Sequence, residues 1–217
     1  MQQALALEDP GWPAVLRWVA MRTRGMLAMA RGQAHLAVPL YRRLLDEARA
    51  AGETGHLQLL QVANAELAAG DAVAAVADGQ RLLPQLAASR DENLRAHASV
   101  NLLLAHLALD QLAPARALAL QVFGGARPVR PHAWFLDALA LLAALEGRVG
   151  AAAQLAAAAD AQYAAAAGLR QFNEQRAHER TLALLAEAGL GPIAAAPVPL
   201  NGALSDGELL ALALAPP

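Results

Sequence analysis

Six histidines are the residues of this sequence best suited to acid–base catalysis or metal binding, because imidazole titrates near neutral pH and binds transition metals. Their spacing argues against both roles. No two of them have the four-residue separation typical of a pair of ligands on one helical face, and there is no HExxH motif. We therefore expect no metal site among the six, which are His35, His56, His97, His106, His132 and His178.

Several other kinds of catalysis are excluded by residue types that the sequence lacks. All 17 residues counted as lysine or arginine are arginines, so there is no lysine for a P-loop or a Schiff base. There is also no cysteine, which excludes thiol nucleophiles, thiolate metal sites and disulfides. Ser89, Ser99 and Ser205 lie outside any GxSxG motif. We therefore predict a protein that is not an enzyme and needs no cofactor.

Charge and hydropathy exclude further classes of function. The formal net charge is -2 and the pI is near 6.3, which provides no basic field for phosphates and predicts no direct binding of nucleic acid. Glu8 and Asp9 stand where a secretory signal would be basic. The longest apolar stretch, residues 133–145, is interrupted by Asp137 and is shorter than the roughly 20 residues that span a bilayer. We expect a cytoplasmic protein without a membrane partner.

The elements that position any binding site are predicted to be helices, because alanine and leucine dominate and β-branched residues are sparse. Helix starts are indicated at Asp9–Pro10, at Ser89 with Glu92, and at Ser205 with Glu208, the last two matching a capping box. We predict about ten helices in five antiparallel pairs, the last pair loosely joined. Their approximate ranges are 12–30, 34–51, 54–69, 72–88, 90–109, 112–123, 131–146, 149–167, 171–188 and 206–214.

A repeat organises these helices. A glycine or polar residue follows an apolar stretch, and an alanine stands five positions later at the start of an amphipathic stretch. The glycine supplies a positive φ at the end of the first helix, and the alanine lets the second helix pack closely against it. The repeat recurs with periods of 38, 40 and 37 residues, at Gly32 and Ala37, Gly70 and Ala75, Asp110 and Ala115, and Gly147 and Ala152.

This unit resembles the tetratricopeptide repeat, which has a small residue in the middle of its first helix and an aromatic residue in its second. Gly25, Ala63 and Ala140 match the small position, and Tyr41 matches the aromatic one. The periods exceed the 34 residues of the standard repeat, so this is a divergent version. The departures are Leu103 at the small position and Gly79, Ala119 and Ala156 at the aromatic one.

The resemblance implies an all-α fold, a solenoid of antiparallel helix pairs wound into a right-handed superhelix. We assign residues 1–189 to this repeat domain. Residues 190–217 are predicted to form a proline-containing linker and a short C-terminal helix. A plain bundle of alanine- and leucine-rich helices is the alternative.

The last part of the chain carries a more specific pattern. It reads GRVGAAAQLAAAADAQYAAAAGLR over residues 147–170, NEQRAHERTLALLAEAGLG over residues 173–191, and NGALSDGELLALAL over residues 201–214. This is similar to the C-terminal helical region of large bacterial ATPase-linked transcriptional regulators of the LuxR, MalT-like and SARP kinds. The resemblance implies an arm that senses an inducer or partner and communicates with a nucleotide-binding switch. No GKS or GKT motif of such a switch is present in this chain.

The concave face of such a superhelix is the predicted binding site, because the stacked first helices expose side chains there that packing does not use. The mixture of apolar and polar groups suits an amphipathic segment or a small molecule. The apolar members are alternatively part of the core. The predicted members are Arg22, Met26, Met29, Asn64, His97, Asn101, Leu104, Trp134, Asp137 and Leu141.

The leading hypothesis is a non-catalytic module that binds a protein partner or a small-molecule effector in this groove, as the sensing arm of a transcriptional regulator. The alternative is a stand-alone adaptor that scaffolds a protein complex. An enzyme acting through His97 or His106 is a third hypothesis. The first helix is also a candidate for self-association, because it has an apolar side formed by Trp12, Val15, Trp18 and Val19.

Overall fold

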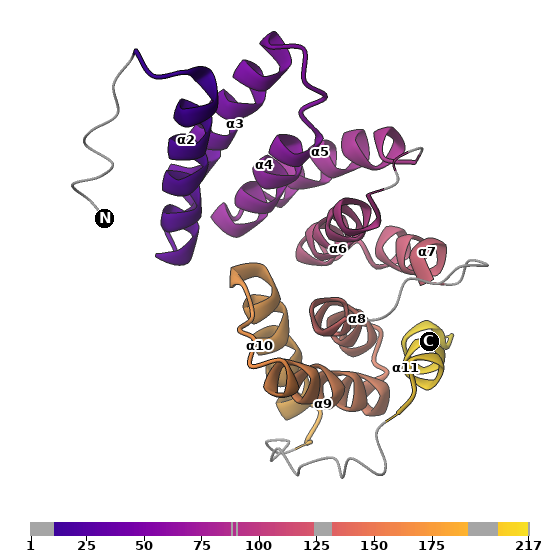
Figure 1. Cartoon of the computed structure of the whole chain (residues 1–217). Helices are drawn as coiled ribbons and strands as arrows, with labels where there is room; N and C mark the ends of the chain where they lie inside the picture. Colours follow the sequence, from indigo (N-terminus) through magenta and orange to yellow (C-terminus); the bar gives the residue numbers. More distant parts are fainter. Residues whose placement is uncertain (1–10, 88, 90, 124–131, 191–203, 217) are drawn as a thin grey trace. The chain divides into compact units, whose positions relative to one another are not determined.

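The computed structural model describes residues 11–87, 89, 91–123, 132–190 and 204–216. Within these ranges every regular element is an α-helix and no strand occurs, which confirms the predicted fold class (Figure 1). The helices are α2 (Ala14–Ala30), α3 (Ala34–Ala50), α4 (His56–Ala69), α5 (Ala72–Gln85), α6 (Glu92–Ala108), α7 (Leu112–Phe123), α8 (Ala133–Leu145), α9 (Val149–Ala165), α10 (Phe172–Glu187) and α11 (Asp206–Leu214).

The predicted capping box at the start of α11 is confirmed. The backbone N–H of Glu208 donates to Ser205 Oγ at 3.3 Å, and the backbone N–H of Ser205 donates to Glu208 Oε2 at 2.7 Å. The backbone N–H and the hydroxyl of Ser205 both donate to Glu208 Oε2 at 2.7 Å and lower the pKa of the Glu208 carboxyl. Two of the N–H groups that a helix start leaves without a partner are thereby satisfied.

The predicted cap at Ser89 is wrong, because Asp91 takes its place. Helix α6 begins at Glu92, and the backbone N–H of Leu94 donates to Asp91 Oδ1 at 2.9 Å. Ser89 Oγ instead accepts a hydrogen bond from the backbone N–H of Asp91 at 3.1 Å. Both side chains are good cap residues, and the one adjacent to the helix reaches its first turn. The start predicted at Asp9–Pro10 lies outside the described residues.

All four predicted turn residues have the left-handed backbone conformation. The φ angles are 69° at Gly32, 91° at Gly70, 53° at Asp110 and 75° at Gly147. At each turn the backbone N–H of the left-handed residue donates to the carbonyl three positions earlier. The backbone N–H of the residue that follows it donates to the carbonyl five positions before that following residue. These bonds form a Schellman motif, which ends one helix and redirects the chain into the next. The predicted turn therefore recurs at all four positions in the backbone.

The alanines that follow these turns pack where the sequence places them, because Ala37, Ala75, Ala115 and Ala152 are all buried. In the first helix pair, Gly25 of α2 lies directly against the ring of Tyr41 in α3. The small and aromatic positions of the repeat therefore meet in this pair, where a larger residue at position 25 would hold the helices apart.

Packing divides the chain into two units, residues 1–101 and 102–217, with the division inside α6. In the first unit α2 packs on α3, α3 on α4, and α4 on α5. In the second unit α8 packs on both α9 and α10, and α11 contacts α7, α8 and α9. Of the predicted linker before the C-terminal helix, residues 191–203 lie outside the described residues.

Helix α8 is the centre of the second unit. Phe135, Leu136, Leu139 and Leu142 are almost completely buried, and the rings of Phe123 and Phe135 meet edge to face with centroids 4.6 Å apart. A helix that is apolar on every side has to be covered on every side. In the part of the chain that the structure describes, no helix combines the length and hydropathy needed to cross a membrane.

We predict that Gly25→Ala destabilises the protein, because the new Cβ would lie within 2.9 Å of Cε1, Cζ and Oη of Tyr41. Overpacking of this kind costs about 1 to 3 kcal/mol in the free energy of unfolding, measurable by urea denaturation. Gly150→Ala in α9 is the matched control, because its Cβ would meet no atom within 4 Å. That variant should be as stable as the native chain or slightly more stable. Equal stability of the two variants would contradict the described contact.

Candidate functional site

The predicted groove residues of the first unit lie on three helices. Arg22 and Met26 of α2 are exposed. Asn64 of α4 is half-buried, as are His97 and Asn101 of α6. Met29 of α2 packs against the core cluster of this unit. Binding by these residues stays a prediction.

The predicted groove residues of the second unit are mostly buried. Leu104 and Leu141 belong to the core. Trp134 is half-buried and stacks on Phe135, with ring centroids 4.3 Å apart. Asp137 has no solvent exposure, so its carboxylate is not on an open surface. Its charge is instead met by partners from the same unit.

Asp137 is the buried centre of a charge cluster between α8, α9 and α10, in which the Asp160 side chain is 43% exposed. Arg170 Nε donates to both carboxylate oxygens of Asp137, at 3.1 and 2.9 Å, and Arg170 Nη2 donates to Asp160 Oδ1 at 2.5 Å. The guanidinium also lies 4.5 Å from the ring centroid of Tyr163. One arginine in the α9–α10 connection thus joins a carboxylate of α8 to one of α9.

His178 of α10 lies between the same two carboxylates. Its Nδ1 is 3.6 Å from Asp137 Oδ1, and its Nε2 is 3.7 Å from Asp160 Oδ1. These separations allow an ion pair but exceed hydrogen-bond length, and Nδ1 is buried without a hydrogen-bond partner. The imidazole therefore lies within ion-pair distance of carboxylates from α8 and α9.

Two neighbouring groups in this cluster have raised pKa values. Burial, followed by the charges of Asp137 and Glu174, raises the pKa of the Tyr163 hydroxyl. Burial also raises the pKa of Glu174, and Oε2 of this carboxyl has no hydrogen-bond partner. Both shifts follow from the cost of placing negative charge in a poorly solvated site that already contains one.

The sequence analysis selected Asp137 but missed Arg170, Asp160 and His178. A signal for a partner existed, because an acidic residue inside an apolar stretch must be paired when that stretch is buried. The sequence did not indicate which residue pairs with Asp137, because Arg170 is 33 positions away along the chain. The cluster fastens three helices together and has no open surface at Asp137, so we interpret it as structural.

Arg170→Met should lower the free energy of unfolding by about 3 kcal/mol, because it leaves the buried carboxylate of Asp137 without its main partner. Adding Asp137→Leu should recover part of this loss, since two apolar side chains of similar volume need no compensation. Urea denaturation of both variants measures the difference. Arg176→Met on the exposed side of α10 is the control and should cost less than about 1 kcal/mol. A double variant no more stable than Arg170→Met alone would contradict the assigned pairing.

A second buried carboxylate, Glu66 of α4, lies in the first unit. Arg42 Nη2 donates to Glu66 Oε1, whereas Oε2 is buried without a hydrogen-bond partner. Asp78 of α5 is buried nearby, with Oδ2 at 3.9 Å from Arg42 Nη2 and Oδ1 at 3.2 Å from Arg81 Nη1. Burial first, and then the charge of Asp78, raise the pKa of Glu66 from 4.5 to about 7.

This raised pKa predicts a stability that depends on pH. A carboxyl with a higher pKa in the folded than in the unfolded chain stabilises the fold in its protonated form, and this contribution is lost as the pH rises from 4.5 towards 7. We therefore compare the free energy of unfolding of Glu66→Gln with that of the native chain at each pH. Between pH 4.5 and pH 8 this difference should shift in favour of Glu66→Gln by on the order of 2 kcal/mol. Thermal unfolding of both proteins across this range tests the change. Parallel pH profiles would contradict it.

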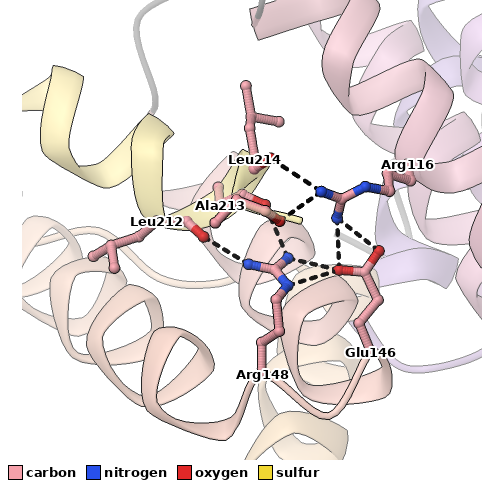
Figure 2. A network of polar contacts seen from close by, with 7 residues as sticks. Arg116, Glu146, Arg148, Leu212, Ala213 and Leu214 are labelled. Atoms are coloured by element: carbon pink, nitrogen blue, oxygen red, sulfur yellow. Dashed lines mark hydrogen bonds and ion pairs between the residues drawn. The ribbon is translucent and has the colours of Figure 1, made fainter. Parts of the chain in front are cut away.

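The second unit also contains a polar network that holds the end of α11 (Figure 2). Arg116 Nη1 donates to both oxygens of Glu146 at 2.9 Å. Arg148 donates to Glu146 Oε2 through Nε at 2.9 Å and through Nη2 at 2.7 Å. Glu146 and Arg148 flank Gly147, so the fourth turn of the repeat brings their side chains together. We call Arg116, Glu146 and Arg148 the helix-end clamp.

The helix-end clamp binds main-chain oxygens of α11 and the residue after it. Arg148 donates to the carbonyls of Leu212 at 2.6 Å and Ala213 at 2.9 Å. Arg116 Nη2 donates to the carbonyls of Leu214 at 3.0 Å and Ala215 at 2.5 Å (Figure 2). The last carbonyls of a helix have no partner within it and carry partial negative charge, so the two guanidinium groups satisfy both their hydrogen bonding and their charge.

The sequence analysis did not identify the helix-end clamp. It placed a helix at residues 206–214, which is confirmed, but it named none of the three clamp residues. In the described ranges no three histidine, aspartate or glutamate side chains converge as ligands of a metal ion. The hydrogen bonds of the clamp show arginine side chains binding carbonyl oxygens.

Comparison of the chain with protein-family models, with curated proteins and with solved structures gave no match in any of the three. The resemblance of residues 147–214 to the tails of transcriptional regulators therefore stays a prediction.

Proposed function

We propose that this protein is a non-catalytic helical-repeat module that binds a protein partner or an effector, as the sensing arm of a cytoplasmic transcriptional regulator would. The observation that carries the proposal is an exposed apolar stripe on α2. Val15, Val19 and Met26 are 60%, 46% and 57% exposed. With Arg22 they follow the spacing of one helical face, and we call these four residues the α2 stripe.

An exposed stripe of this kind favours an interaction surface over an ordinary outer face. Helix pairs of a solenoid bury their apolar residues against the neighbouring pair, whereas the apolar side chains of the stripe are exposed among the residues that the structure describes. The large apolar residues of α2 lie in neighbouring turns, so they form a group on the surface and are not isolated exposed side chains. The stripe is thus a surface that a second helix can cover.

The α2 stripe carries positive charge, which favours an acidic partner. Six arginines occur between Gly11 and Leu45, and three of them are paired with carboxylates, Arg17 and Arg43 with Glu47 and Arg42 with Glu66. Arg22 itself lies within the stripe and is exposed. An amphipathic helix with apolar residues and a carboxylate on the same face complements this surface in both shape and charge. We infer that the partner presents such a helix.

A labelled amphipathic acidic peptide should bind the full chain more tightly than a peptide of the same apolar pattern with lysine in place of its acidic residues. Val19→Asp or Arg22→Glu should weaken the binding of the acidic peptide at least about tenfold, because each removes an attraction and adds a repulsion. Fluorescence anisotropy measures the affinities. Val73→Asp on α5 is the control, since Val73 is also exposed but lies outside the stripe. Equal affinity for both peptides contradicts the proposal.

Thermal unfolding with a library of metabolites and nucleotides separates sensing from scaffolding. A ligand that binds only the folded state raises the melting temperature. A compound whose shift is lost in Arg22→Glu supports an effector site. Peptide binding without any such compound supports the adaptor alternative, in which the stripe holds a protein partner and senses nothing.

A further inference from the structure

The helix-end clamp recognises its occupant through the backbone alone. All four of its bonds to the end of α11 and the next residue reach main-chain oxygens of residues 212–215, and none reaches a side chain. Any helix that ends at this place offers the same unpaired carbonyls and the same partial negative charge. The clamp therefore fits a class of helix ends rather than one sequence.

Side-chain selectivity comes from a narrow apolar contact next to the clamp. In α11 only Leu209 and Ala213 are buried, and they lie one turn apart on the same face. The remaining residues of the helix are exposed or half-buried. The site thus accepts a large apolar residue and, four positions later, a small one that lets the helix end approach the guanidinium groups.

Glu146 holds both arginines of the clamp from the side of the helix turn. Its side chain is only 6% exposed with α11 in place and bonds to both guanidinium groups, so contacts other than those to α11 help to orient them. A preorganised site loses less freedom on binding than one that has to assemble. Its two positive charges and one negative charge leave an excess of positive charge facing the helix end.

Helix α11 is suited to leave this site. It contains nine residues, fewer than an isolated helix needs for stability in water, so it depends on docking to stay folded. Pro216 cannot continue the helix, and Ala215 has the extended conformation, with φ -52° and ψ 143°, that a following proline favours. The chain therefore ends the helix where its carbonyls face the clamp.

We propose that the helix-end clamp is a receptor for the C-terminal turn of a short amphipathic helix, and that α11 occupies it until a partner helix of the same chemistry displaces it. That partner helix carries a large apolar residue and a small one four positions later, and it ends within the next turn. The site lies in the second unit and stands independently of the α2 stripe.

The test uses the full chain and a fluorescent peptide with the sequence of residues 204–217, LSDGELLALALAPP. Leu209→Asp in the chain removes the apolar contact of its own α11 and leaves the clamp intact. The peptide should then bind at least about tenfold more tightly to this variant than to the native chain, where the tethered helix competes at high effective concentration. Adding Arg148→Gln to Leu209→Asp should abolish the gain. Anisotropy titrations measure all three proteins.

A peptide that itself carries Leu209→Asp is the matched control and should not bind. Circular dichroism establishes whether the Leu209→Asp chain is folded. If it is not, Ser205→Ala replaces it, because loss of the capping box weakens α11 by about 1 kcal/mol without touching the clamp, and the peptide should bind about fivefold more tightly. The proposal is overturned if the peptide fails to bind the folded variant, or if it binds equally well after Arg148→Gln.

Discussion

Close approach between paired helices is the constraint on which the rest of this structure depends. The sequence contains no cysteine, so packing and polar contacts hold the helices without a covalent cross-link. Small side chains at the contacts bring the backbones together, and a left-handed residue lets the chain reverse within a tight turn. Gly25 against Tyr41 is the strictest example of this contact. The tight turns between paired helices also fix the positions of several polar side chains, because those side chains stand at the turns.

Arginine solves the problem that this close packing creates for acidic residues. Asp137, Glu146 and Glu66 are all nearly inaccessible to water, and each is paired with an arginine. A guanidinium has five donors in a rigid plane, so one side chain can serve two acceptors at once. Arg170 joins two carboxylates in this way, and Arg116 joins Glu146 to the end of α11. The single ammonium of lysine has no such fork.

The two surfaces proposed for binding use different physics. The α2 stripe is an apolar face with an arginine in it, so it discriminates through side chains and through charge. The helix-end clamp has its donors fixed by Glu146 and discriminates mainly through a helix terminus. A partner that satisfies one of these surfaces need not satisfy the other.

The sequence by itself determined the helices, their turns and the cap at Ser205, because these depend on residues within about five positions of one another. Even here Asp91 displaced Ser89, since two good caps competed two residues apart. Tertiary structure alone decided which charges meet. Arg116 and the carbonyl of Ala215 are 99 positions apart, and no local pattern records a bond that exists only after separate helices have packed.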